Sequence, residues 1–176
     1  LTPFRCPAAP RGPGDPQPLP HLDGPEHRAH GGLEISVEVH LSSKQMREAG
    51  LKPVRLSLGN FSDMYWTIGQ FVTHHTSNGC NLRPGDLLGS GTISGPRRES
   101  RGCLLELTWD GDKETPKPGT QRTPLVLPTG EKRIFLADGD EVTLRGYAEG
   151  AGRRRIVLGE CRGEVLPASG PEITGT

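Results

Sequence analysis

Residues 33–41 read Leu-Glu-Ile-Ser-Val-Glu-Val-His-Leu, and this stretch decides the fold class because apolar and polar side chains alternate along it. A period of two places the apolar side chains on one face of a strand and the polar ones on the other. The stretch therefore predicts a half-buried strand with one face in water. The polar residues 42–53 that follow predict a short helical turn, and Val54, Leu56 and Leu58 predict a second short strand.

One helix is expected, over residues 61–75. Its apolar residues recur at the three- and four-residue spacing of an amphipathic helix. Asn60 or Ser62 can cap its start, and Asn78-Gly79 supplies a left-handed stop. His74 and His75 fall in the last turn, where a protonated imidazole suits the helix dipole. Adjacent helical positions point about 100° apart, so we interpret this pair as one packed and one capping histidine rather than a metal site.

Beyond the helix, the chain predicts short strands separated by turns. A polar loop is expected over 113–124 and a frayed tail from Pro167. Turns are marked by glycine, proline and aspartate, as in Arg83-Pro84-Gly85-Asp86. With one principal helix, this pattern predicts a mainly β (α+β) fold. The expected strands are 87–93, 103–109, 125–127, 134–136, 142–144, 156–158 and 165–166.

The composition excludes several classes of protein. The chain has 176 residues, with 21 basic and 21 acidic side chains, so no basic excess points to nucleic acid as a partner. No apolar run approaches the roughly 18 residues of a membrane helix, so no membrane partner is expected. With no secretory signal visible, a cytoplasmic location is expected. Residues 1–32 are rich in proline and glycine and predict an extended segment that precedes a folded domain over 33–176.

The cysteines and N-terminal histidines give weak signals. Four cysteines without a C-x-x-C pair could form two disulfides in a secreted chain, but free thiols fit a reducing cytoplasm better. The cysteines are Cys6, Cys80, Cys103 and Cys161. His27 and His30 form an H-x-x-H pair beside His21, but no carboxylate or cysteine stands at ligand spacing. No metal ligand is therefore assigned in this chain.

Glu106 is the first candidate for chemistry. In the strand expected over 103–109, alternation places Glu106 with Leu104 and Thr108 on one face. A carboxylate between leucines is costly to bury unless it is paired. Two roles remain open from the residues alone: a structural salt bridge, or a group placed for proton chemistry.

A second candidate is the stretch Gly89–Gly95, which reads GSGTISG. Its glycines let a ligand or another backbone approach, and Ser90 and Thr92 offer hydroxyl groups on one face. The alternative is a bent strand with a bulge. The stretch lacks the G-K-[ST] of a phosphate loop. Asp138-Gly139-Asp140 resembles half a calcium loop, but it lacks the closing glutamate, and we interpret it as a tight turn.

Several of these motifs together resemble the fumarylacetoacetase (fumarylacetoacetate hydrolase) family, in order and over nearly the whole chain. Ile93 after Gly91-Thr92 distinguishes the chain from sister enzymes of the wider superfamily, which usually carry proline there. The matching segments are Asp15–Pro20, Met64–Thr67, Thr73–His75, Asn78–Leu88, Ser90–Pro96, Leu105–Leu107, Asp138–Val142 and Gly163–Pro167.

The resemblance implies hydrolysis of a carbon–carbon bond in 4-fumarylacetoacetate, a β-diketo acid, to give fumarate and acetoacetate in tyrosine and phenylalanine breakdown. It implies a mixed β-sandwich roll, a homodimer, and Ca²⁺ with an accessory Mg²⁺. Thr92 corresponds to a threonine that contacts substrate. Glu106 corresponds to a glutamate beside the catalytic histidine and its water.

The resemblance covers only the C-terminal part of the catalytic domain. The family's catalytic histidine, acidic metal ligands and oxyanion residues belong to motifs that precede the segment matched here, and none of the six histidines fits the catalytic motif. We therefore expect an incomplete chain that is inactive alone. Two alternatives remain: a non-catalytic folding or dimer-interface module, and a related enzyme acting on another β-diketone.

Overall fold

The computed structural model describes residues 1–109 and 122–170. Most of the polar loop expected over 113–124 and the end of the expected tail lie outside these residues. The described part is built on one four-stranded antiparallel sheet with few helices, which confirms the mainly β fold class. The strand order is β4-β3-β7-β8, and the strands are β3 (Ser36–Ser42), β4 (Val54–Asn60), β7 (Glu141–Gly150) and β8 (Arg153–Glu164).

The alternation of residues 33–41 is realised in β3, the strand between β4 and β7. Val39 pairs with Leu144 of β7 and with Ser57 of β4, so these side chains share one face of the sheet. Glu38 and His40 lie on the opposite face, where His40 Nε2 is 2.9 Å from a carboxylate oxygen of Glu38. The strand begins at Ser36, because Gly32–Leu33 instead form β2, which pairs with β1 (Arg5–Cys6).

The N-terminal 32 residues, predicted as an extended segment, are only partly extended. They contain the 3-10 turns η1 (Thr2–Phe4) and η2 (Pro20–Leu22) and the helix α1 (Pro25–His30). Phe4 is 1% exposed and packs with Ile35 and Ala148 of the sheet region. A few apolar side chains, Phe4 among them, therefore pack this proline-rich segment against the sheet region.

The principal helix is α3 (Ile68–Thr76), which starts seven residues later than the sequence predicts. Thr67 caps it through Gln70: the Gln70 backbone N–H donates to Thr67 Oγ1, and the Thr67 N–H donates to Gln70 Oε1. This reciprocal capping box fixes the start of a helix more strongly than apolar spacing alone. The preceding residues form only the 3-10 turn η3 (Phe61–Asp63), capped by Asn60. Gly79, with φ +86°, follows the helix as predicted.

Other predicted strands are shorter than expected or absent. Residues 125–126 form β5 and pair with β6 (Lys132–Arg133), while 134–136 and 165–166 lie just beyond β6 and β8. The strand predicted over 87–93 is wrong: this segment has no strand partner within the described residues, and Leu87 is 96% exposed. A strand needs a partner to bond its backbone groups, and the glycines here add no side chains to hold one.

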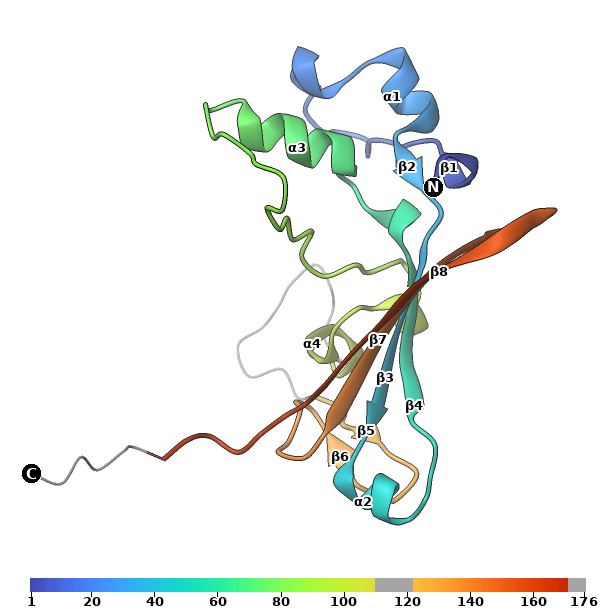
Figure 1. Ribbon diagram of the computed structural model, residues 1–176, viewed down its shortest axis with the longest axis vertical. Coiled ribbons are helices and arrows are strands. Elements are labelled where there is room, and N and C mark those ends of the chain that lie inside the picture. The colour runs from blue at the N-terminus through green and yellow to red at the C-terminus, as the bar shows by residue number, and fades with distance from the viewer. Residues whose placement is uncertain (110–121, 171–176) are drawn as a thin grey trace, which may run out of the picture.

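Two small cores flank the sheet. Figure 1 shows α1 and α3 gathered at one end of the sheet, and α2 (Lys44–Glu48) with β5 and β6 at the other. At the second end, Leu41, Met46 and Leu127 form the buried cluster. Beside it the turn at Asp138-Gly139 is confirmed, and the buried Asp140 binds the guanidinium of Arg133. No helix in the described residues is long and apolar enough to cross a membrane.

Candidate functional site

Glu106 lies on a single helical turn, not on a strand. The strand predicted over 103–109 is wrong: residues Leu104–Leu107 form α4, preceded by Cys103 in an extended conformation. A short apolar run fits a buried strand and a buried helix equally well by its pattern, and the leucines and glutamate here favour the helix. Successive side chains in a helical turn point about 100° apart, so Glu106 does not share a face with Leu104 as strand alternation would require.

Four side chains complete the C-terminal end of α4. A helix leaves its last four carbonyl groups without partners in the helix, and so short a turn is not stable by itself. Here Thr108 Oγ1 donates to Leu104 O at 2.8 Å, and three arginines donate to the next three carbonyls. Arg122 binds Leu105 O at 2.8 Å, Arg101 binds Glu106 O at 2.8 Å, and Arg98 binds Leu107 O at 3.0 Å. The backbone that carries Glu106 is therefore held in place from several segments.

The Glu106 carboxylate is half-buried and bound by a neighbouring hydroxyl. Ser94 Oγ donates to Glu106 Oε2 at 2.5 Å, and the Cys103 thiol lies 3.4 Å from the same oxygen. Ser94 Oγ also accepts the backbone N–H of Gly102 at 3.0 Å. One serine thus couples the carboxylate to the loop before α4, and no salt bridge to Glu106 is present among the described residues.

Thr92 and Glu106 are brought into one region by close backbone packing. A Cβ atom at Gly102 would lie 2.3 Å from the Ile93 carbonyl oxygen and 2.8 Å from the Thr92 methyl group. Only glycine allows this approach, so the segment 92–95 lies directly against the loop that leads into α4. Thr92 itself is exposed to solvent. Ser90 Oγ donates to the Gly91 carbonyl at 3.0 Å, and because residues 87–93 form no strand, strand alternation does not place Ser90 and Thr92 on one face.

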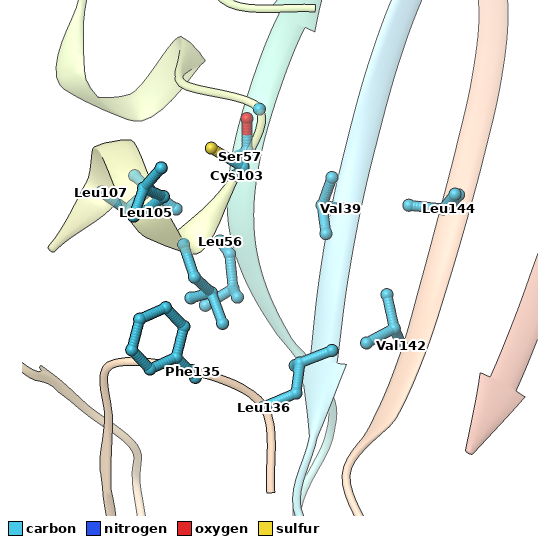
Figure 2. Close-up of a pocket in the computed structure, with 12 residues that line it drawn as sticks. Val39, Leu56, Ser57, Cys103, Leu105, Leu107, Phe135, Leu136, Val142 and Leu144 are labelled. Carbon is cyan, nitrogen blue, oxygen red and sulfur yellow. The ribbon is translucent and has the colours of Figure 1, made fainter. Parts of the chain in front are cut away.

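An apolar cavity of about 590 Å³ lies on the other side of α4, over the apolar face of the sheet. Figure 2 shows Leu105 and Leu107 of α4 facing this space, with Val39 and Leu144 of the sheet opposite. Glu106 does not line it. The full lining is Val39, Leu56, Ser57, Gly102, Cys103, Leu104, Leu105, Leu107, Phe135, Leu136, Val142 and Leu144.

The described residues do not fit a metal ion by themselves. Nowhere in residues 1–109 and 122–170 do three histidine, cysteine or acidic side chains gather as a metal-binding group. Glu106 has oxygen ligands suited to Ca²⁺ or Mg²⁺, but its neighbours are a serine hydroxyl and a thiol rather than further carboxylates. None of the six histidines contacts Glu106 in the described structure. All four cysteines are free.

Sequence reasoning missed the residues that support the candidate site. Ser94 lies within the glycine-rich stretch 89–95, but strand alternation there points to Ser90 and Thr92 and does not indicate Ser94. Arg98 and Arg101 stand in the run Arg97-Arg98-Glu99-Ser100-Arg101 just before α4. A cluster of arginines beside a short apolar run is a signal that could have pointed to a capped helix.

The comparisons with known proteins agree over most of the chain. Residues 14–166 match the family model described as Fumarylacetoacetate (FAA) hydrolase C-terminal. The chain is 46% identical over 168 residues to a Homo sapiens protein named fumarylacetoacetase, an alignment that covers 96% of this chain and 35% of that protein. It is 44% identical over 168 residues to the Arabidopsis thaliana fumarylacetoacetase, with 96% and 35% covered. The Caenorhabditis elegans fumarylacetoacetase is 54% identical over 109 residues, with 62% and 23% covered.

The aligned segment includes both Thr92 and Glu106, since both lie inside residues 14–166. The chain spans about a third of the length of the curated relatives it matches. The match to the family model extends over far more than half of the chain. The chain therefore belongs to the fumarylacetoacetate hydrolase C-terminal family.

Proposed function

We propose that this chain supplies part of the active site of an enzyme that hydrolyses 4-fumarylacetoacetate to fumarate and acetoacetate. The reaction cleaves a carbon–carbon bond of a β-diketo acid. The proposal is supported by the relatives, which are named fumarylacetoacetase and match the chain at 42–46% identity over 168 residues. Because the chain corresponds to about a third of these relatives, the activity is proposed for the complete enzyme.

The single observation that carries the proposal within the structure is the Ser94–Glu106 hydrogen bond of 2.5 Å. It joins the glycine-rich segment that bears Thr92 to the carboxylate that the family resemblance assigns to catalysis. Glu106 has no salt bridge in the described residues. No cation there therefore supports the alternative that Glu106 is a structural, salt-bridged carboxylate. Its other carboxylate oxygen, Oε1, has no hydrogen-bond partner among residues 1–109 and 122–170, and we assign it the bond to the group that Glu106 orients.

In this proposal Glu106 orients an imidazole that the complete enzyme provides. A carboxylate hydrogen-bonded to one ring nitrogen sets which nitrogen is free to take a proton from water, and it stabilises the imidazolium that results. Ser94 and the arginine-capped backbone of α4 keep the carboxylate from rotating away. Thr92, exposed on the adjacent segment, binds the substrate through its hydroxyl group.

The resemblance implies Ca²⁺ and Mg²⁺, but the proposed role of Glu106 and Thr92 involves neither ion. The described residues supply no metal-binding group, so any such ion in the complete enzyme depends on ligands from elsewhere. The chain's own contribution is limited to orienting the base and contacting the substrate.

A hybrid enzyme tests this proposal. The aligned 168 residues of the Homo sapiens fumarylacetoacetase are replaced by this chain, and the loss of diketone absorbance is followed with fumarylacetoacetate as substrate. We expect hydrolysis by the hybrid. Glu106→Gln should lower kcat by about 10²- to 10⁴-fold, as for other orienting carboxylates. Ser94→Ala should lower it by about tenfold, since a charge-assisted hydrogen bond contributes roughly 1.5 kcal/mol.

Two matched controls complete the experiment. Glu99→Gln removes an exposed carboxylate that pairs with Arg97, and Ser77→Ala removes an exposed hydroxyl that bonds a helix carbonyl. Both should leave kcat unchanged. A folded hybrid that does not cleave the substrate would overturn the proposed function. Wild-type turnover by Glu106→Gln would show that Glu106 has a structural role and does not orient the base.

A further inference from the structure

The side chains of Cys80 and His75 lie beside each other, in a part of the chain far from α4. The Cys80 sulfur lies 3.3 Å from His75 Nε2, within hydrogen-bond distance for a thiol and an imidazole. Both side chains are exposed to solvent. Neither side chain contacts Glu106 or Ser94 in the described residues.

The end of α3 brings the two side chains together. The helix stops at Thr76, and Ser77 bonds back to His74 O through both its N–H and its hydroxyl group. Gly79 then turns the chain with φ +86°, a conformation that residues with a side chain rarely adopt. The Asn78 side-chain oxygen accepts the backbone N–H of Cys80 at 3.1 Å. Each of these contacts holds the thiol beside the last turn of the helix.

The position of His75 favours transfer of the thiol proton. His75 lies in the last turn of a nine-residue helix, where the exposed carbonyl groups stabilise positive charge. An imidazole that accepts the proton of Cys80 there becomes a favoured imidazolium, and a thiolate is left beside it. Thiolates, not thiols, are the nucleophiles in cysteine chemistry. Figure 1 shows this end of α3 directed away from the main sheet, so an approaching molecule meets no sheet strand there.

We propose that Cys80, activated by His75, is a covalent modification site for α,β-unsaturated carbonyl compounds. The Cys80 proton moves to His75 Nε2, and the sulfur adds to the β-carbon of the compound. A carbon–sulfur bond forms while the carbon–carbon π bond becomes an enolate. The enolate then takes the proton from the His75 imidazolium at its α-carbon, so that the product is a neutral thioether and no oxidant or reductant is consumed. The site acts independently of the proposed hydrolase function.

The remaining cysteines differ from Cys80 in ways that make them internal controls. Cys161 is exposed on β8 but has no histidine partner in the described structure. Burial raises the pKa of the Cys6 thiol, and the nearby Glu34 carboxylate adds to this effect. Cys103 directs its thiol to the Glu106 carboxylate. Cys161 is therefore the matched control, since it is also exposed but has no histidine partner among the described residues.

The test uses the whole chain and N-ethylmaleimide, an uncharged α,β-unsaturated carbonyl probe. The rate of adduct formation at each cysteine is measured at pH 7 by peptide mass spectrometry. We expect Cys80 to react about tenfold faster than Cys161, in line with the activation that a neighbouring histidine gives a thiol. His75→Asn and His75→Gln should each reduce the Cys80 rate to about that of Cys161.

His74→Asn is the matched control variant. His74 is the adjacent histidine of the same helical turn, and its described hydrogen bonds use only its backbone carbonyl. This variant should leave the Cys80 rate unchanged. The proposal is overturned if Cys80 reacts no faster than Cys161 in the wild-type chain, a comparison that needs no variant to fold. It is equally overturned if neither His75 variant slows Cys80.

Discussion

Arg133 binds two carboxylates at once, beside the buried cluster of Leu41, Met46 and Leu127. Its Nε lies 2.7 Å from Asp140, and one terminal nitrogen lies 2.9 Å from both Asp140 and Glu131. Asp140 is fully buried, so removing the guanidinium would leave an unpaired charge away from water. Glu131 also accepts hydrogen bonds from the hydroxyl groups of Ser43 and Thr129. We interpret Arg133, Asp140 and Glu131 as a polar cluster that stabilises the fold through these hydrogen bonds and ion pairs.

The Glu131 cluster predicts a dependence of stability on pH. The hydrogen bond from Ser43, then that from Thr129, then Arg133 lower the pKa of Glu131 to about 2. Because the pKa in the folded chain is below the value of about 4.3 expected in the unfolded chain, the stabilisation is complete above about pH 5. It is lost as the pH falls toward 2. The urea midpoint of wild type should therefore fall more steeply between about pH 5 and 2.5 than that of Glu131→Gln.

Glu99→Gln is the control for this experiment, because Glu99 is an exposed carboxylate whose one ion pair among the described residues is with Arg97. It should keep the wild-type slope. Parallel pH profiles for wild type and Glu131→Gln would show that the Glu131 hydrogen bonds contribute nothing to folding.

Among the secondary-structure elements, α3 depends on its first turn. Thr67 and Gln70 are both buried, and Gln70 Nε2 also donates to Leu22 O at 2.8 Å. The capping box therefore starts the helix and ties the N-terminal segment to it at the same time. The apolar spacing from Phe61 predicts a helix that packs through residues such as Ile68 and Val72, but this face is wrong: these two side chains are 46% and 39% exposed, and Gln70 is the buried side chain of α3. The start of the helix is set by a threonine and a glutamine three residues apart.

Thr67→Ala should destabilise the chain by about 1 kcal/mol, the usual cost of losing an N-cap hydroxyl. Thr73→Ala is the matched control, because its hydroxyl bonds only Gly69 O within the same helix. It should change the free energy of unfolding by less than about 0.5 kcal/mol. Both values come from urea titrations followed by circular dichroism. Equal effects of the two substitutions would contradict the role of the capping box.

At the scale of the whole molecule, apolar surface remains uncovered. The cavity over the sheet has an apolar lining, and large apolar side chains such as Val157 and Leu158 are more than half exposed on β8. β8 is an edge strand of twelve residues, with one side of its backbone unpaired in the described structure. Long exposed edge strands pair with other chains. The homodimer implied by the family resemblance is one way in which such a surface is covered.

We expect the chain to self-associate at tens of micromolar, roughly the range where a moderate interface is occupied. Val157→Lys should reduce association, since a charge on an edge strand opposes pairing. Val126→Lys is the matched control: Val126 and Val157 are each 67% exposed, but Val126 lies on the two-stranded β5–β6 sheet. Light scattering measures both. A clean monomer for wild type, or the same effect from both lysines, would contradict this prediction.

The sequence by itself determined the features that depend on local pattern. Alternation over 33–41 predicts which side chains of β3 share a face, and Asn78-Gly79 predicts the end of the helix. The polar face is not in water as expected, because the Glu38 and His40 side chains are only 13% and 15% exposed. The order of motifs predicted the family, because a long series of matching segments carries information that no single motif holds. These features follow from side-chain periodicity and backbone preference, which act between near neighbours in the chain.

Only the tertiary structure decided the features that depend on contacts between distant segments. Within the run 103–109, residues Leu104–Leu107 form a helical turn, and Arg98, Arg101 and Arg122 stabilise it by donating to its carbonyl oxygens. The segment 87–93 lost its predicted strand because no partner strand lies beside it in the described residues. Ser94 reached Glu106 because Gly102 lets the two segments pack backbone to backbone. Hydrogen-bond partners for buried backbone groups are supplied across the fold, so periodicity along the chain does not reveal them.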